Sequence, residues 1–358
     1  MRVQDRLSQL GQLFMVGIPH PTLDNETRTL LQELRPSGII LFRRNYTGPA
    51  ALAVLCTELH SLFSTHTLLI ALDHEGGRVH RVSPPFTHFP PAMRIGQTGS
   101  VALAYLVGLA MGHELRRVGI DLDFAPVLDV LTNPANTVIG DRSFSSDPYQ
   151  VALFGRALIR GLRESGVIPC GKHFPGHGGT LMDSHEDLPQ DDRRREELDR
   201  IDLYPFQQAI REGIEMLMTA HVRYLALDPE LPATVSPKII TGLLRQQMHY
   251  DGVVVTDDLE MGAVVRHSTV EQTVINALNA GADMMLVCHK IELALAARDA
   301  CLRAVENGTL SHQRVEEAVQ RINALRHAHQ SRQELAPPPP KEHEHVQLVE
   351  EILRIGAY

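Results

Sequence analysis

Short runs of apolar residues recur along the chain at fairly regular intervals, and each is followed by a helix-like segment. Most of these runs are continuous rather than alternating, which is typical of parallel strands that helices cover on both faces. The pattern therefore predicts repeated strand–helix units with right-handed crossovers. Eight strands are expected, at Leu13–Ile18, Gly38–Phe42, Leu68–Asp73, Ile120–Pro126, Val167–His173, Met216–His221, Gly252–Asp257 and Ala282–Cys288.

The helices between these runs carry their own start signals. Asp147 and Pro148 supply an N-cap and a proline at the first helical position, and Ser236 and Pro237 repeat the arrangement. Eight such units close naturally into a single (β/α)₈ barrel of the TIM type, an α/β fold for which 358 residues is an ordinary length. The alternative is an open doubly wound sheet. It would need a glycine-rich dinucleotide loop after the first strand, and Gly17-Ile-Pro-His-Pro is not one.

The C-terminal part of the chain departs from this pattern. After a last helix near Gln313–Ala328, the run Pro337–Pro340 cannot be helical and favours polyproline II. Helical spacing returns at His345–Ile355. We therefore expect a barrel domain over residues 1–330, followed over residues 331–358 by a short proline-rich linker and a C-terminal helix.

Composition and charge exclude several classes of protein. The chain is 43% hydrophobic and 22% charged, which is globular, and its net charge of −9 argues against a nucleic-acid partner. No apolar run approaches the roughly 18 residues of a membrane span, and the N-terminus lacks a secretory signature. The four cysteines have the spacing of neither a disulfide framework nor a zinc site. We expect a cytoplasmic monomer or weak homo-oligomer without a cofactor.

Ionisable residues gather at the expected carboxyl ends of the strands, where a barrel carries its catalytic groups. The third strand ends in the stretch Asp73–Arg81, the fifth runs into Gly171–Gly179, and the seventh ends in Thr256–Asp258. Such groups are costly unless they are paired or used, so their concentration at one mouth predicts a site for a polar ligand. Structural ion pairs are the alternative for any one of these groups.

The segment Lys172–Pro189 is the most informative part of the chain. His173, His177 and His185 suggest a metal site, but the prolines and glycines among them disfavour the helix that would align two of them. The glycines are not followed by the G-K-[ST] of a phosphate-binding loop. The pair Asp183 and His185 fits better, because a carboxylate tunes an imidazole for proton transfer in both directions. A surface Asp–His pair is the alternative.

Asp257 ends the hydrophobic run Gly252–Thr256 and is expected at a rigid position facing the barrel mouth. A carboxylate there can attack an anomeric carbon and form a covalent glycosyl–enzyme intermediate. Helix capping is the alternative role for this residue. The neighbouring Asp258 points elsewhere if the strand continues, so we expect a structural role for it.

Four spaced motifs stand in order along the chain: Asp73-His-Glu-Gly-Gly-Arg-Val-His-Arg81, Ile139-Gly-Asp-Arg142-Ser-Phe, Lys172-His-Phe-Pro-Gly-His-Gly-Gly-Thr-Leu-Met-Asp-Ser-His185 and Val255-Thr-Asp257-Asp-Leu-Glu-Met261. Together they resemble the signature of family 3 glycoside hydrolases of the bacterial NagZ type, the β-N-acetylhexosaminidases. The resemblance covers roughly residues 7–328.

This resemblance implies roles for individual residues. Asp257 matches the nucleophile, and His185 matches the general acid/base, paired with Asp183. The residues that match ring-binding positions for N-acetylglucosamine are Asp73, Arg81, Arg142, Lys172 and His173. The implied activity is a retaining exo-β-N-acetylhexosaminidase that works by double displacement. Its implied substrates are muropeptides containing N-acetylglucosamine, in peptidoglycan recycling, or chitooligosaccharides.

Three other functions stay open at the level of sequence. A histidine acid/base carries no negative charge, so phosphate can replace water as the acceptor and make the chain a phosphorylase. A β-glucosidase of the same family would keep the fold and change the sugar. A sugar-binding barrel with no activity is the third, although every catalytic position of the family is matched.

Overall fold

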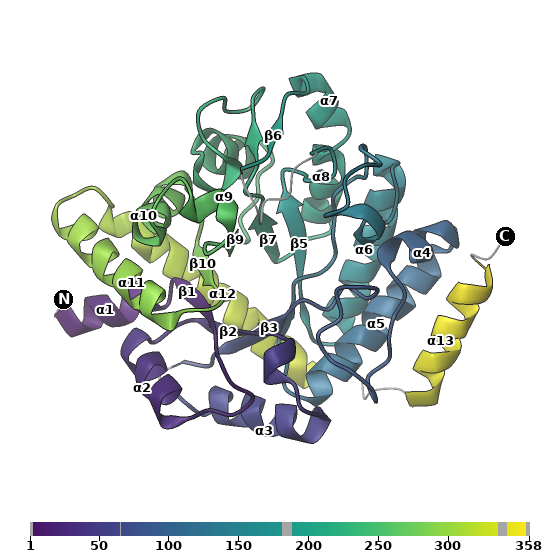
Figure 1. Cartoon of the computed structure of the whole chain (residues 1–358), viewed down its shortest axis with the longest axis horizontal. Helices are drawn as coiled ribbons and strands as arrows, with labels where there is room; N and C mark the ends of the chain where they lie inside the picture. The colour runs from purple at the N-terminus through teal and green to yellow at the C-terminus, as the bar shows by residue number, and fades with distance from the viewer. Residues whose placement is uncertain (1–2, 65, 181–187, 336–341, 356–358) are drawn as a thin grey trace.

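The computed structural model describes residues 3–64, 66–180, 188–335 and 342–355. Its centre is a closed barrel of parallel strands in the order β1-β10-β9-β7-β5-β4-β3-β2 (Figure 1). The predicted (β/α)₈ fold is therefore confirmed, and the open doubly wound sheet is wrong. The barrel strands are β1 Phe14–Gly17, β2 Gly38–Leu41, β3 Leu69–Leu72, β4 Leu122–Asp123, β5 Ile168–Phe174, β7 Met216–Thr219, β9 Val253–Asp258 and β10 Met284–Val287.

Burial on both faces explains why the strand sequences are continuously apolar. Every residue of β1, β2, β3, β7 and β10 is buried, because barrel side chains fill the interior while the outer face packs on helices. The register places Ala71 of β3 beside Leu122 of β4, and Leu122 beside Ile168 of β5. The carboxyl ends of the strands consequently meet at one mouth.

Strand β4 is much shorter than its predicted range Ile120–Pro126. The carboxylate of Asp121 accepts the N–H of Ile70 at 2.8 Å, and that of Asp123 accepts the N–H of His74 at 2.9 Å. Side chains thus take the donors that a regular ladder would pair with main-chain carbonyls. Pro126 also has no N–H to donate. These departures from main-chain pairing explain why the regular strand covers only Leu122–Asp123.

Helices form the outer ring. The predicted cap at Asp147 is confirmed, whereas the helix after Ser236 begins at Lys238 with Pro237 as its N-cap, one residue later than predicted. Asp147 accepts the N–H of Tyr149 at 3.0 Å, and the Ser236 hydroxyl accepts the N–H of Ile239 at 3.2 Å. The helices of the ring are α2 Asn25–Leu34, α3 Pro49–His60, α5 Val101–Arg117, α6 Pro148–Glu164, α8 Leu203–Arg211, η4 Lys238–Gln247, α10 Val270–Ala280 and α11 Ile291–Glu306. Short helices in the connections are α4 Ala92–Gln97, α7 Arg195–Arg200, α9 Gly262–Val265, η1 Arg43–Asn45, η2 Gly140–Arg142 and η3 Ala233–Val235.

Helix α12, His312–Leu335, crosses the amino-terminal end of the barrel, and α1, Val3–Gly11, precedes β1. Along α12, Arg326 donates to the carbonyl of Ser37 and His329 contacts Asp121 at 3.0 Å. Both partners lie where barrel strands begin. The helix is longer than the predicted Gln313–Ala328 and continues past residue 330, where the barrel was expected to end.

The predicted C-terminal helix is confirmed as α13, Glu342–Ile355, which packs against α5 and α4 (Figure 1). His345 Nδ1 lies 2.7 Å from the Glu114 carboxylate, and Arg94 donates to the carbonyl of Leu353 at 2.8 Å. The run Pro337–Pro340 lies outside the described residues. The division into barrel and tail stays a prediction. Among the described residues, no helix combines the length and apolar character that a membrane crossing requires.

Candidate active site

A cavity of about 260 Å³ opens at the carboxyl ends of the barrel strands. It is lined by residues on or just after β2, β3, β5, β7, β9 and β10, so it lies over the barrel axis. This is the position at which barrels of this type carry their active sites. The predicted site residues among its lining are Asp73, Arg81, Arg142, Lys172, His173 and Asp257.

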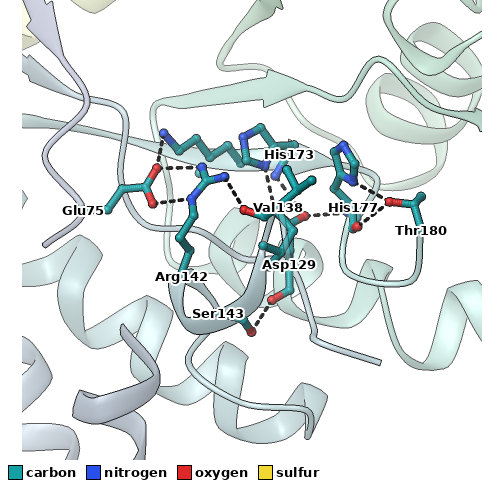
Figure 2. Close-up of polar contacts among 12 residues, drawn as sticks. Glu75, Asp129, Val138, Arg142, Ser143, His173, His177 and Thr180 are labelled. Atoms are coloured by element: carbon teal, nitrogen blue, oxygen red, sulfur yellow. Dashed lines mark hydrogen bonds and ion pairs between the residues drawn. The ribbon is translucent and has the colours of Figure 1, made fainter. Parts of the chain in front are cut away.

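Charged side chains in the wall of the cavity form a connected network, which includes the pair of Glu75 and Arg142 (Figure 2). Lys172 Nζ lies 2.6 Å from a carboxylate oxygen of Asp73 and 2.6 Å from one of Glu75. Arg142 donates through Nε and Nη2 to the two oxygens of Glu75, both at 2.8 Å. Arg81 lies 3.6 Å from the second oxygen of Asp73. The structure thereby brings the predicted ring-binding charges together.

Glu75 is the anion that makes this cluster possible, and the sequence analysis did not single it out. Burial raises the pKa of Glu75, but Arg142 and Lys172 outweigh burial and hold that pKa below its ordinary value. In return, Asp73 and Glu75 raise the pKa of Lys172 against the opposing effect of burial. Glu75, Lys172 and Arg142 are therefore all charged at neutral pH. The only sequence signal for Glu75 was its position in the Asp73–Arg81 motif.

A second residue that the sequence analysis missed is Asp129, on the loop after β4. Its carboxylate lies 2.7 Å from His173 Nδ1 and accepts the main-chain N–H of His173 and of His177 (Figure 2). The Ser143 hydroxyl donates to the main-chain carbonyl of Asp129 at 2.6 Å. A carboxylate on Nδ1 selects the tautomer with the proton there, so Nε2 of His173 is left for the cavity.

Asp257 lies at the end of β9 and is partly exposed to the cavity. One carboxylate oxygen accepts the N–H of Asp258 at 2.8 Å. Burial raises the pKa of Asp257, but His173, His221 and Lys172 more than offset burial, and the pKa is lowered. The carboxylate is consequently ionised at neutral pH, which is the state that a nucleophile requires.

The neighbouring Asp258 has the structural role expected for it. Its carboxylate accepts the N–H of Glu260 at 3.1 Å and of Cys288 at 3.2 Å, which ties the end of β9 to the end of β10. Burial, reinforced by Glu260 and Asp257, raises the pKa of Asp258 to about 7. The two adjacent aspartates are therefore in opposite electrostatic environments, and only the pKa of Asp257 is lowered.

The two other predicted catalytic residues, Asp183 and His185, lie outside the described residues. The glycines that precede them are explained by close packing. A Cβ on Gly178 would lie 1.9 Å from the carbonyl oxygen of Val130, and one on Gly179 would lie 2.3 Å from the Arg193 guanidinium. Among the described residues, no three His, Cys, Asp or Glu side chains are grouped as metal ligands.

Comparisons with known proteins give one consistent result. Residues 4–325 match the family described as the glycosyl hydrolase family 3 N-terminal domain. A β-hexosaminidase from Thiobacillus denitrificans is 42% identical over 291 residues, or 80% of this chain and 80% of that relative. A β-hexosaminidase from Methylococcus capsulatus is 42% identical over 300 residues, or 83% of this chain and 87% of the relative.

Solved structures agree with the sequence relatives. A family 3 β-N-acetylglucosaminidase from a Paenibacillus species superposes with a TM-score of 0.93 at 40% identity, covering 99% of this chain and 69% of that one. NagZ from Neisseria gonorrhoeae, in complex with N-trifluoroacetyl-D-glucosamine, superposes with a TM-score of 0.80 at 33% identity. That alignment covers 96% of this chain and 98% of that one.

Proposed function

The chain belongs to glycosyl hydrolase family 3, and we propose that it is a retaining exo-β-N-acetylhexosaminidase that releases terminal N-acetylglucosamine. One observation carries the proposal: the carboxylate of Asp257, whose pKa is lowered, lines the same cavity as the Lys172–Glu75–Arg142 network. A nucleophile and a set of fixed donors and acceptors thus face one bound sugar.

The dimensions of the cavity favour cleavage at a chain end. Its volume of about 260 Å³ is below the roughly 300–1,000 Å³ typical of sites for drug-sized ligands. A single sugar ring matches such a space better than the interior of a polysaccharide.

The polar groups are arranged to bind sugar hydroxyls, each of which can donate and accept a hydrogen bond. The ammonium group of Lys172 has three N–H donors, and two of them point at Asp73 and Glu75. Among the described residues, the third N–H has no partner, so it is left for a hydroxyl group of the sugar. Asp73 keeps acceptor capacity beyond its bond to Lys172. We assign ring binding to Asp73, Arg81, Arg142, Lys172 and His173.

In the first chemical step, a carboxylate oxygen of Asp257 forms a bond to C1 as the bond from C1 to the leaving oxygen breaks. We assign to His185, paired with Asp183, the proton that the leaving oxygen receives. In the second step, His185 takes a proton from water, the water oxygen bonds to C1, and the ester bond to Asp257 breaks. Two inversions at C1 retain the β configuration.

Muropeptides with a terminal N-acetylglucosamine are the substrates that we propose, in peptidoglycan turnover or recycling. Similarity to NagZ from Neisseria gonorrhoeae supports this choice. We also propose a cytoplasmic location. The four cysteines, Cys56, Cys170, Cys288 and Cys301, are all buried and unpaired, which fits a reducing compartment.

Hydrolysis of a nitrophenyl β-N-acetylglucosaminide tests the proposal, with Asp257→Ala compared against Asp258→Asn. We expect the first variant to lose roughly four orders of magnitude in kcat, because its nucleophile is missing. The second should keep most of its activity, because asparagine still offers an oxygen to the N–H groups of Glu260 and Cys288. A fluorinated substrate analogue should label Asp257, as detected by mass spectrometry of the digested protein.

Three results would contradict the proposal. Full activity of Asp257→Ala would show that Asp257 is not the nucleophile. A preference for the nitrophenyl glucoside over the N-acetylglucosaminide would make the chain a β-glucosidase. Sugar 1-phosphate as the main product when phosphate is present would make it a phosphorylase.

A further inference from the structure

Strand β9, which carries the proposed nucleophile, is irregular at its carboxyl end. On one side it pairs with β7 as far as Val255. On the other side, Met284 and Leu286 of β10 pair with Val255 and Asp258, so two steps along β10 correspond to three along β9. One extra residue in a strand is the pattern of a β-bulge, which bends the strand and re-aims a side chain. Asp257 lies within this bulged interval.

Side chains hold the bulge where main-chain pairing stops. Among the described residues, neither neighbouring strand provides a register partner for Asp257. Toward β10, the Thr256 hydroxyl accepts the N–H of Leu286 at 3.1 Å, and the Asp258 carboxylate accepts the N–H of Cys288 at 3.2 Å. The position of the nucleophile therefore depends on side-chain contacts more than that of an ordinary strand residue does.

His221 is the corresponding contact toward β7. It follows Met218 by three residues, just as Asp258 follows Val255, so the two would be partners if the ladder continued. Instead, His221 Nε2 lies 3.0 Å from the main-chain carbonyl of Asp258. A carbonyl oxygen can only accept, so Nε2 carries a proton and donates it. The same carbonyl accepts the N–H of Met261 at 3.2 Å, and two donors thus fix its direction.

Two buried hydroxyl groups hold the imidazole of His221 in this orientation. His221 Nδ1 lies 2.7 Å from the hydroxyl oxygen of Thr234, on η3. That oxygen lies 2.9 Å from the Thr219 hydroxyl, on β7, and donates to the carbonyl of Ala220 at 3.1 Å. All three side chains of this chain of contacts are at most 2% exposed. Rotation of the ring would leave buried polar atoms without partners, which is costly.

We infer that His221 is a positioning residue for the nucleophile: by holding the carbonyl of Asp258, it keeps the Asp257 carboxylate in line with C1 of the bound sugar. Asp258 is the link, because its N–H donates to a carboxylate oxygen of Asp257 at 2.8 Å while its carbonyl accepts from His221. The inference rests on the proposed function and adds a residue that supports the reacting atom from outside the ring-binding set.

His221 also faces Asp257 electrostatically, together with two groups on β5. His173 and Lys172, like His221, lower the pKa of Asp257 against the opposing effect of burial. Loss of the His221 imidazole should therefore raise the pKa of Asp257 and move the acid limb of the kcat/KM profile to higher pH. A residue that only stabilises the fold would not move this limb.

Two substitutions of His221 test the inference. His221→Ala removes the donor, and we expect kcat for a nitrophenyl β-N-acetylglucosaminide to fall by roughly 10- to 100-fold, with KM little changed. The rate at which a fluorinated analogue labels Asp257 should fall in the same proportion. His221→Gln restores an N–H donor to the Asp258 carbonyl and should recover most of kcat. The acid limb should lie at higher pH in both variants, because neither has the imidazole.

His113→Ala is the matched control, because His113 is a buried histidine of α5 that does not line the catalytic cavity. It should change neither kcat nor the acid limb. If His221→Ala does not fold, Thr234→Val replaces it, since this variant removes the hydroxyl that orients the ring and should also lower kcat and the labelling rate.

Several outcomes would overturn the inference while the proposed function stands. They are an unchanged kcat in His221→Ala or, in its place, in Thr234→Val; a loss in His221→Gln as large as that in His221→Ala; an unmoved acid limb; and an equal loss in His113→Ala. Failure of the wild-type protein to cleave any N-acetylglucosaminide would instead overturn the proposed function, and the role of His221 with it.

Discussion

Two buried carboxyl groups beneath the proposed sugar site differ in charge because of their neighbours. Glu75 lies between Lys172 and Arg142, which keep its pKa low despite burial. Burial raises the pKa of Asp123 well above its ordinary value, and one of its oxygens has no partner in the described part of the chain. The ionised form of Glu75 is therefore favoured by its neighbours, whereas burial disfavours the ionised form of Asp123. Replacement of each residue by the corresponding amide should therefore have different effects on the free energy of unfolding.

We expect Glu75→Gln to lower the free energy of unfolding by about 3 kcal/mol, because it removes the carboxylate that pairs with the buried Arg142 and one of the two carboxylates that pair with Lys172. It should also raise KM for the N-acetylglucosaminide, since both cations move away from their fixed positions. Asp123→Asn should change stability by less than about 1 kcal/mol. Urea unfolding monitored by circular dichroism measures both. Similar losses in the two variants would contradict the charge assignment.

Asp129 is a positioning residue that acts through His173. In Asp129→Asn, the side-chain amide facing His173 Nδ1 donates rather than accepts, which forces the other tautomer of the imidazole. We expect kcat/KM to fall by up to roughly 100-fold. Loss of the Asp129 carboxylate should also weaken the effect by which His173 lowers the pKa of Asp257, so the acid limb of the kcat/KM profile should move to higher pH.

Ser143→Ala is the control for this effect, because the Ser143 hydroxyl donates to the main-chain carbonyls of Asp129 and Ser145 and not to the Asp129 carboxylate. It should leave the pH profile in place. A uniform loss of activity in Asp129→Asn at every pH, with an unmoved acid limb, would assign Asp129 to structure alone.

At the scale of elements, α12 is fastened to the barrel by ion pairs rather than by an apolar stripe alone. Arg314 and Arg321 pair with Asp283 at the start of β10, and Arg332 pairs with Glu215 at the start of β7. His329 contacts Asp121 beside β4, where His60 lies 2.7 Å from the second carboxylate oxygen. The docking of this helix consequently depends on the ionisation of carboxylates at the strand starts.

The pH dependence of stability should reveal the Asp121 contacts. Burial raises the pKa of Asp121, but its hydrogen bonds to His329 and His60 prevail and lower the pKa from 3.8 to about 2. A lowered pKa contributes stability that is fully present well above pH 3.8 and is lost as the pH falls toward 2. Asp121→Asn should therefore cost about 2 kcal/mol at pH 6 and progressively less below pH 4, as measured by urea unfolding.

Asp251→Asn gives the baseline for this measurement, because Asp251 is an exposed carboxylate near the start of β9 that makes no ion pair with the described residues of α12. Its effect should be small at every pH. A cost of Asp121→Asn that stays constant between pH 6 and pH 3 would mean that α12 docks without help from this charge.

At the scale of the whole molecule, the fold was predictable and parts of the site were not. Continuous apolar runs such as Met216–Thr219 identify buried parallel strands without knowledge of any contact. The predicted length of β4 is wrong for a local reason: the carboxylates of Asp121 and Asp123 accept main-chain N–H groups from β3 and the residues after it. Sequence spacing predicts which side chains reach a barrel mouth, because strand ends share that mouth in every closed barrel.

Residues that act across strands escaped the sequence analysis. Glu75 follows β3 but owes its charge to groups on β5 and η2, and Asp129 follows β4 but contacts His173 on β5. No local pattern encodes such pairings, because they arise when the barrel closes. Motif resemblance located their neighbours, and the structure supplied the contacts.

The path of α12 also bears on how the protein is made. The helix follows all the barrel strands in the sequence, yet it contacts Ser37, Asp121, Glu215 and Asp283 at the starts of β2, β4, β7 and β10. During synthesis all the barrel strands therefore leave the ribosome before α12 does, and domains generally acquire structure from the N-terminus as they emerge. The contacts between α12 and these strand starts can therefore form only after residues 314–332 emerge, and a chain stalled earlier leaves that end of the barrel uncovered.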